Sequence, residues 1–248
     1  MVQPRGPANQ DDQARQLEGS ALAADFDHDP ERFAANQLAT QNFSMIGDVH
    51  DRVAERLAKI TAGPILDLGG GNGTLAKSLA RQGRGAIVVD RADYVRGAPR
   101  PAVQADAIRL PFRAECFAAV AALWMLYYLD EPALALVEAS RVLRAGGIFV
   151  ACTSSRYNDP EFASVLPGWG EPFSFDAETA PEIISEHFKI TEVIKWDTPV
   201  VRLPDEAAVA LFLRGRGLRA EDASLQAGRW NTPLSVTKRG CLIWACRP

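Results

Sequence analysis

The chain has 248 residues, of which 47% are hydrophobic and 23% charged, as in an ordinary globular protein. The formal net charge of −4 disfavours nucleic acid as a partner, because a nucleic-acid-binding surface is normally basic. No apolar run has the length of a membrane span, so we expect a cytoplasmic protein with no membrane partner. The four cysteines form no C-x-x-C pair, and we expect reduced thiols and no metal.

The first part of the chain contains a polar segment followed by a helical pattern. Residues 1–25 are rich in Gln, Asp, Ala, Pro and Gly with little periodicity, and we expect a mobile tail. Residues 31–60 have apolar residues at helical spacing, and Gly63-Pro64 ends this pattern. The apolar stripe consists of Ile46, Val49, Val53, Leu57 and Ile60.

From residue 65 the chain alternates between short apolar runs and helical patterns. Continuous apolar runs are typical of strands buried on both faces of a parallel sheet. We predict strands at 65–69, 86–90, 102–106, 118–124 and 148–154. Helices are expected over 73–82 and 131–145, the second ended by Gly146-Gly147. This order predicts a doubly wound, Rossmann-like α/β sheet that is mostly parallel, with helices on both faces.

The last third of the chain has a different pattern. Residues 190–196 and 237–248 alternate in the manner of two strands, and 205–218 between them is typical of a short amphipathic helix. Two late strands after a parallel sheet predict an antiparallel C-terminal hairpin at the sheet edge, with a long insertion.

A dense glycine cluster follows the first predicted strand in the stretch ILDLGGGNGTLAKSLA, residues 65–80. Glycines between a strand and a helix let the backbone approach a ligand closely. A triphosphate loop is excluded, because Gly73 is followed by Thr74 and not by the required Lys. The dinucleotide pattern fits at Gly69 and Gly71, but Thr74 replaces its third small residue, so a nicotinamide oxidoreductase remains an alternative.

The pattern D-x-G-x-G-x-G is matched completely, and here the chain resembles the class I S-adenosylmethionine (SAM)-dependent methyltransferases. The matching residues are Asp67, Gly69, Gly71 and Gly73. The resemblance covers roughly residues 47–155 and includes LPF at 110–112 and RVLRAGG at 141–147. One departure is that Phe117 is followed by Ala118, where many relatives have Asp. The resemblance implies a Rossmann-like fold, SAM as the cofactor and methyl transfer as the activity.

The resemblance also implies which residues bind the cofactor. Asp67 would lie near the methionine ammonium group, Asp90 would accept hydrogen bonds from the ribose, and Asp106 would receive the adenine amino group. Leu123 and Trp124 would cover the cofactor, although packing in the core explains Trp124 equally well. The complete expected set is Asp67, Gly69, Gly70, Gly71, Gly73, Asp90, Arg91, Asp106, Ala107, Leu123 and Trp124.

No catalytic residue follows from the sequence with similar strength, because a base is needed only if the methyl acceptor must lose a proton. The candidates are His50 on the N-terminal helix, Tyr127 and Tyr128 after the fourth strand, and Tyr157 after the fifth. Each of them also has an ordinary packing or surface role as its alternative.

We expect the N-terminal helix, the 155–180 loop and the 200–232 insertion to bind the substrate. The loop indicates either a packed surface segment or an aromatic lid. Its aromatic residues are Tyr157, Phe162, Trp169, Phe173 and Phe175. The basic stretch RGRGLRA at 214–220 indicates either a solvated face or contact with an acidic group of the substrate.

We therefore expect one methyltransferase domain at 26–248 after the tail, acting on an O or N of a small molecule. Its expected parts are a helical cap at 26–62, a SAM-binding core at 63–155, substrate-side loops and an insertion at 156–236, and a final strand at 237–248. Alternatives are a methyltransferase acting on RNA or protein, and a SAM-fold protein that binds a ligand without turnover. A monomer and a homodimer are both compatible with the sequence.

Overall fold

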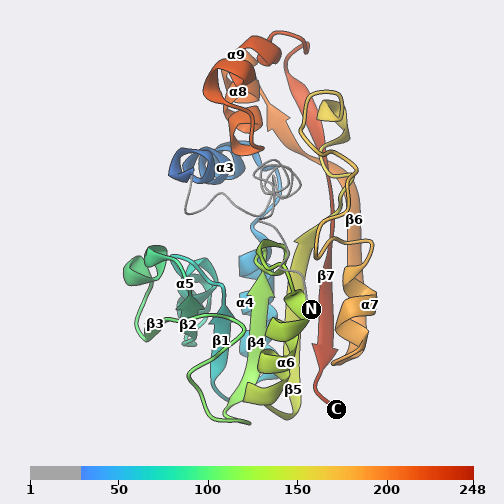
Figure 1. Cartoon of the computed structure of the whole chain (residues 1–248). Helices are drawn as coiled ribbons and strands as arrows, with labels where there is room; N and C mark the ends of the chain where they lie inside the picture. Colours follow the sequence, from blue (N-terminus) through green and yellow to red (C-terminus); the bar gives the residue numbers. More distant parts are fainter. Residues whose placement is uncertain (1–28) are drawn as a thin grey trace, which may run out of the picture.

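Seven strands form one sheet in the order β3-β2-β1-β4-β5-β7-β6 in the computed structural model, which describes residues 29–248 (Figure 1). The predicted tail at 1–25 lies outside the described residues. Strands β1 to β5 pair in parallel, and β7 is antiparallel to both β5 and β6. The strands are β1 Ile65–Leu68, β2 Ile87–Asp90, β3 Ala102–Gln104, β4 Phe117–Leu123, β5 Leu143–Ser154, β6 Lys189–Leu203 and β7 Leu234–Cys246. The predicted doubly wound fold with an antiparallel edge hairpin is confirmed.

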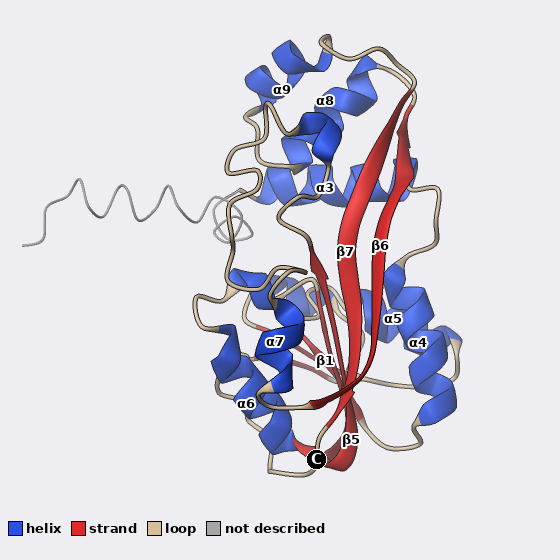
Figure 2. Cartoon of the chain, turned by 90° about the vertical axis from the view of Figure 1, so that its right-hand side faces the viewer, coloured by secondary structure: helices blue, strands red, loops and turns tan. Residues whose placement is uncertain are grey.

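Helices cover both faces of the sheet (Figure 2). On one face lie α4 (Val49–Ile60) and α5 (Thr74–Arg81), and on the other lie α6 (Pro132–Val142) and α7 (Ala180–Ser185). Each face has its own apolar cluster, and all four residues of β1 are buried between them. Burial on both faces explains why the central strands are continuous apolar runs rather than alternating ones. None of the described helices is long and apolar enough to cross a membrane.

A second layer of helices sits at the far end of the β6–β7 hairpin, which extends well beyond the other strands (Figure 2). This layer contains α8 (Glu206–Gly215) and α9 (Ala220–Ala227), with α3 (Pro30–Phe43) packed against α8. We call α3, α8, α9 and the outer part of the hairpin the cap. The cap has an apolar cluster of its own, which includes Val209, Phe212 and Leu213.

The helical pattern at 31–60 is interrupted, so the prediction of one apolar stripe there is wrong at its ends. Helix α3 ends at Phe43, and α4 starts anew because the Asp48 side chain caps it by accepting the backbone N–H of His50. Ile46 lies between the two helices and is 45% exposed, and Ile60 is 49% exposed. The stripe that packs on the sheet is reduced to Val49, Val53 and Leu57.

Further boundaries differ from the predictions. Strand β6 continues to Leu203, beyond the predicted end at residue 196, and β7 starts at Leu234 rather than at residue 237. Helix α6 ends at Val142, and β5 passes directly through Gly146-Gly147, where the pairing with β4 is irregular and Gly146 has φ +70°. Strand β3 ends before Asp106, and α7 and α9 were not predicted because they have only six and eight residues. Short 3₁₀ turns are present at Asp93–Gly97, Leu126–Tyr128 and Pro160–Phe162.

Candidate active site

A cavity of about 1290 Å³ extends from the carboxyl ends of the central strands to the cap. At the end near the central strands its wall includes Gly71, Asp90 and Trp124, and at the cap end it includes Asn36 and Lys238. Ligand pockets usually measure roughly 300–1,000 Å³, so this one has room for a cofactor and a second molecule. The position outside the carboxyl ends of the strands is where open α/β sheets bind ligands.

The glycine loop after β1 forms the floor of the cavity. A Cβ atom at Gly69 would lie 2.6 Å from the Met125 side chain, and one at Gly70 would lie 2.5 Å from Asp67, so packing alone excludes side chains there. Gly71 has φ +54°, and a Cβ atom on it would meet nothing closer than Asp90 Oδ2 at 4.0 Å. Gly71 therefore presents bare backbone to the open cavity.

Asp67 and Gly73 lie behind this loop and do not line the cavity. The Asp67 side chain is fully buried, accepts the N–H of Ala76 at 3.3 Å, and burial raises its pKa to about 6. A Cβ atom at Gly73 would lie 2.6 Å from Pro99. Both residues hold the loop in place, and direct contact of Asp67 with a cofactor ammonium group stays a prediction.

Asp90 closes β2 and faces the glycine loop. Its Oδ2 accepts the N–H of Gly71 at 2.8 Å, and its Oδ1 accepts the N–H of Ala92 at 2.8 Å. Each carboxylate oxygen has a second lone pair, so the group can accept further hydrogen bonds from a ligand in the cavity. Arg91 lies beside it on the cavity wall.

Asp106 and Ala107 line the same wall, in the turn after β3. Asp106 Oδ1 accepts the N–H of Ile108 at 3.1 Å, which fixes the turn. The structure thus brings Asp90, Arg91, Asp106 and Ala107 to one side of the cavity, as the sequence predicted, although their contacts with a cofactor stay a prediction.

Leu123 and Trp124 lie at the end of β4, and both line the cavity. Trp124 has φ +60°, a left-handed conformation that costs a non-glycine residue about 1–3 kcal/mol. Its backbone N–H bonds to the Cys152 carbonyl at 3.0 Å, and its ring makes an edge contact with Trp196 at 6.1 Å between centroids. Strain of this kind at a cavity wall is typical of functional sites.

His50 lies in the first turn of α4 and lines the cavity. Its Nδ1 lies 2.6 Å from Asp48 Oδ1, and its Nε2 has no hydrogen-bond partner within residues 29–248. Burial alone would raise the pKa of Asp48, but the hydrogen bonds from His50 and the charges of His50 and Arg81 together outweigh it and lower this pKa. The carboxylate therefore fixes the imidazole and leaves one ring nitrogen for a ligand, which is the arrangement of a general base.

Two of the three tyrosine candidates line the cavity. Tyr127 and Tyr128 lie with ring centroids 4.5 Å apart. Burial raises the pKa of Tyr128 to about 12 and that of Tyr127 well above its usual value, so both phenols stay neutral near pH 7. Tyr157 is 42% exposed, packs its ring on Trp169 and does not line the cavity. Its proposed place in the catalytic site is therefore not supported.

The 155–180 loop is partly a wall of the cavity and partly a packing segment. Trp169 and Phe173 line the cavity, whereas Phe162 and Phe175 are fully buried in the apolar clusters. The aromatic-lid interpretation thus applies to two of the five aromatic residues.

Several cavity residues were not predicted from the sequence. Asp48 could have been recognised as a helix N-cap two residues before His50. Asn36, Asp159 and Lys238 carry no local signal, because tertiary structure alone brings them to the cavity.

Comparison with known proteins identifies the family. Residues 66–151 match the family model described as a methyltransferase domain. The demethylmenaquinone methyltransferase of Mycolicibacterium paratuberculosis (strain ATCC BAA-968 / K-10) is 32% identical over 204 residues, which cover 79% of this chain and 84% of that protein. The chain belongs to the class I SAM-dependent methyltransferases.

Two further proteins resemble this methyltransferase. The demethylmenaquinone methyltransferase of Clavibacter sepedonicus is 29% identical over 182 residues, covering 69% of this chain and 72% of that one. The N-methyltransferase NodS from Bradyrhizobium japonicum WM9, solved with S-adenosyl-l-homocysteine (SAH), has a TM-score of 0.51 at 16% identity and covers 88% of this chain and 99% of its own. The likeness to NodS shows that the two proteins share a fold.

The cofactor of this methyltransferase is SAM, and the cavity fits it. Bare backbone at Gly71 allows close approach, and the Asp90 carboxylate beside it retains lone pairs for hydroxyl groups. The remaining volume toward the cap leaves room for a methyl acceptor.

Proposed function

We propose that the methyltransferase transfers the SAM methyl group to an oxygen or nitrogen of a small, ring-bearing molecule. The observation that carries this proposal is the single cavity that joins the glycine loop to the cap. Between its two ends the wall is rich in aromatic side chains, which suit a ring. These side chains are Trp124, Tyr127, Tyr128, Trp169, Phe173 and Phe212. The cap above the cavity favours a small molecule over a segment of RNA or protein.

At the end of the cavity near the central strands, the backbone of Gly71 and the side chains of Asp90 and Asp106 would hold the cofactor, with Trp124 covering it. Bound SAM supplies an electrophilic methyl group on a sulfonium. The protein's contribution is then to exclude water, to align the acceptor and to take its proton.

His50 is the proposed base. Its Nε2 would take the proton of the acceptor hydroxyl or amine, while Asp48 keeps the Nδ1–H and stabilises the imidazolium that forms. Tyr127 and Tyr128 stay protonated and act as hydrogen-bond donors or as wall residues rather than as bases.

A second candidate function is methylation of a ring carbon in a hydroxylated quinol. It is supported by the relatives named demethylmenaquinone methyltransferases. Removal of a ring hydroxyl proton by His50 would make the adjacent ring carbon nucleophilic, so the same base serves both reactions.

The test is turnover with SAM that carries a deuterated methyl group, using a panel of hydroxylated and amino-substituted aromatic molecules and a demethylmenaquinol. We expect SAH to form together with a labelled product, and NMR of the product locates the label. A label on oxygen or nitrogen supports the first function, and a label on a ring carbon supports the second. SAH formation only with an RNA or protein fraction would contradict both.

A further inference from the structure

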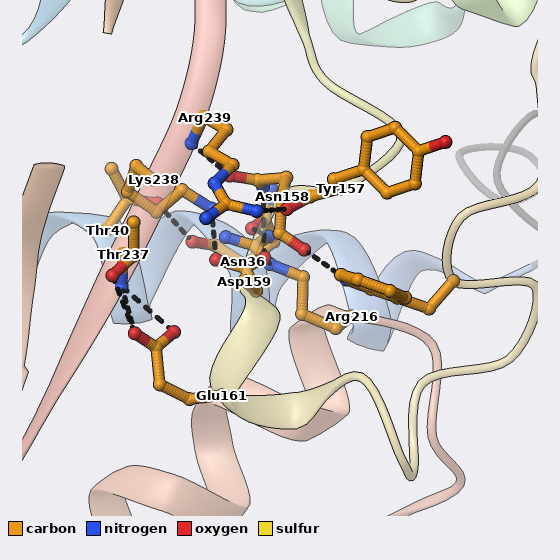
Figure 3. Close-up of polar contacts among 11 residues, drawn as sticks. Asn36, Thr40, Tyr157, Asn158, Asp159, Glu161, Arg216, Thr237, Lys238 and Arg239 are labelled. Atoms are coloured by element: carbon orange, nitrogen blue, oxygen red, sulfur yellow. Dashed lines mark hydrogen bonds and ion pairs between the residues drawn. The ribbon is translucent and has the colours of Figure 1, made fainter. Parts of the chain in front are cut away.

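Two cations share one buried carboxylate where the cap meets β7 (Figure 3). Lys238 Nζ lies 2.6 Å from Asp159 Oδ1, and Arg216 Nε lies 2.7 Å from Asp159 Oδ2. The Asp159 side chain is 2% exposed, and Asn158 also donates to it at 3.0 Å. A second nitrogen of Arg216 bonds to the amide oxygen of Asn36 on α3.

The three charged residues come from distant segments and meet on the cavity wall. Asp159 follows β5, Arg216 follows α8, and Lys238 lies in β7. The guanidinium of Arg216 stacks on the Phe212 ring at 4.6 Å, and the ammonium of Lys238 lies 5.6 Å from the same ring. Both cations are therefore held in place before any ligand binds, which lowers the entropic cost of binding.

The cavity-facing charges of this cluster do not balance. Asp159 carries one negative charge against the two positive charges of Arg216 and Lys238. Glu161 lies nearby, but its carboxylate is bonded to the N–H and hydroxyl of Thr237, and it does not line the cavity. Burial and the charge of Arg216 lower the pKa of Lys238 to about 8, while the charges of Asp159 and Glu161 act in the opposite direction.

Donor groups remain unused on both cations. Arg216 bonds Asp159 through Nε and Asn36 through Nη1, and Nη2 has no partner in the part of the chain that the structure describes. Lys238 gives one of its three protons to Asp159. Both side chains line the cavity, so a ligand can reach these donors.

We infer that Arg216 and Lys238 form a subsite that binds a carboxylate of the substrate at the cap end of the cavity. A singly charged carboxylate offsets the excess positive charge that this cluster presents to the cavity, and it can accept hydrogen bonds from both cations at once. The inference rests on the proposed function, which places the methyl-accepting group of the substrate at the other end of the cavity, near the glycine loop. It specifies the substrate as an aromatic acid whose carboxylate and acceptor group lie at opposite ends.

The test uses the full-length protein saturated with SAH and measures binding of 4-hydroxyphenylacetate and of its uncharged methyl ester by calorimetry. The acid is expected to bind about tenfold more tightly than the ester, as for a charge-assisted hydrogen bond. Lys238→Gln should reduce this ratio to within twofold, and Lys238→Arg should retain it. Lys195→Gln is the matched control, because Lys195 lines the cavity outside the cluster.

Unchanged SAH affinity in every variant shows that each one folds. Equal binding of acid and ester to the wild type, or a preference that survives Lys238→Gln, would overturn the inference. Tighter binding of inorganic phosphate than of the acid would overturn the assignment to a carboxylate. The proposed function is tested separately from the subsite. Acid-selective binding without SAH formation from any hydroxylated acid would support the subsite and contradict methyl transfer to such acids.

Discussion

Substitution of Asp67 by Asn should stabilise the cofactor-free protein at neutral pH. Asp67 lies under the glycine loop, where its carboxylate accepts one hydrogen bond, from Ala76 at 3.3 Å. Burial raises its pKa from 3.8 to about 6, and the nearby charge of Asp90 adds to this, while the charge of His50 acts in the opposite direction. The folded protein therefore disfavours the ionised form of this group.

The size of the effect follows from the shift in pKa. A rise of about 2 pKa units corresponds to roughly 3 kcal/mol between the two protonation states. Below about pH 3 the carboxyl is protonated in both the folded and the unfolded chain, and it costs nothing. As the pH rises from the unfolded pKa of 3.8 to the folded pKa near 6, the unfolded chain releases this proton first, and the folded protein loses up to about 3 kcal/mol of stability. Asparagine stays neutral and can still accept the N–H of Ala76.

Urea unfolding of wild type and Asp67→Asn between pH 3 and pH 8, without SAM, measures this difference. We expect equal free energies of unfolding near pH 3 and an advantage of about 3 kcal/mol for Asp67→Asn above pH 7. The exposed Asp130→Asn variant is the control and should show no such pH dependence. A difference that is constant with pH, or a wild type that is more stable at pH 7, would refute the reasoning.

Three further substitutions test the proposed site. Asp90→Ala removes the hydrogen-bond acceptor beside the glycine loop and should weaken SAM binding by roughly 10- to 100-fold with the fold retained. Unchanged SAM affinity in calorimetry would contradict the role of Asp90 in binding the ribose. Gly71→Val places a branched side chain in the cavity at φ +54° and should abolish SAM binding, whereas normal binding would mean that the loop has another function. His50→Gln should lower kcat by roughly 10²- to 10⁴-fold while SAM affinity stays within twofold, and an equal loss of affinity would assign His50 to cofactor binding instead.

The core of the fold, and the position of Asp90 and Asp106 on one wall of the cavity, could be predicted because their signals are local. Apolar runs separated by helical patterns predict a parallel sheet, and the ends of its strands meet at one edge. Asp90 and Asp106 therefore reach the same wall once the strand order is known. The glycine pattern at residues 69–73 adds a conformational requirement that few other residues can meet.

The cap end of the site could not be predicted, because its residues are far apart in sequence. Asp159, Arg216 and Lys238 meet only through the extension of the β6–β7 hairpin and the packing of α8 on α3. The break in the N-terminal helix depends on a cap by Asp48, which competed with a continuous apolar pattern across it.

The separate apolar cluster of the cap has a consequence for how the sequence of such a protein can evolve. Its residues are not shared with the two clusters that support the sheet and the glycine loop. Substitutions at distant positions without shared contacts have nearly additive effects on stability. Mutations that reshape the cap end of the cavity should therefore leave cofactor binding unchanged, and selection can act on the choice of substrate alone.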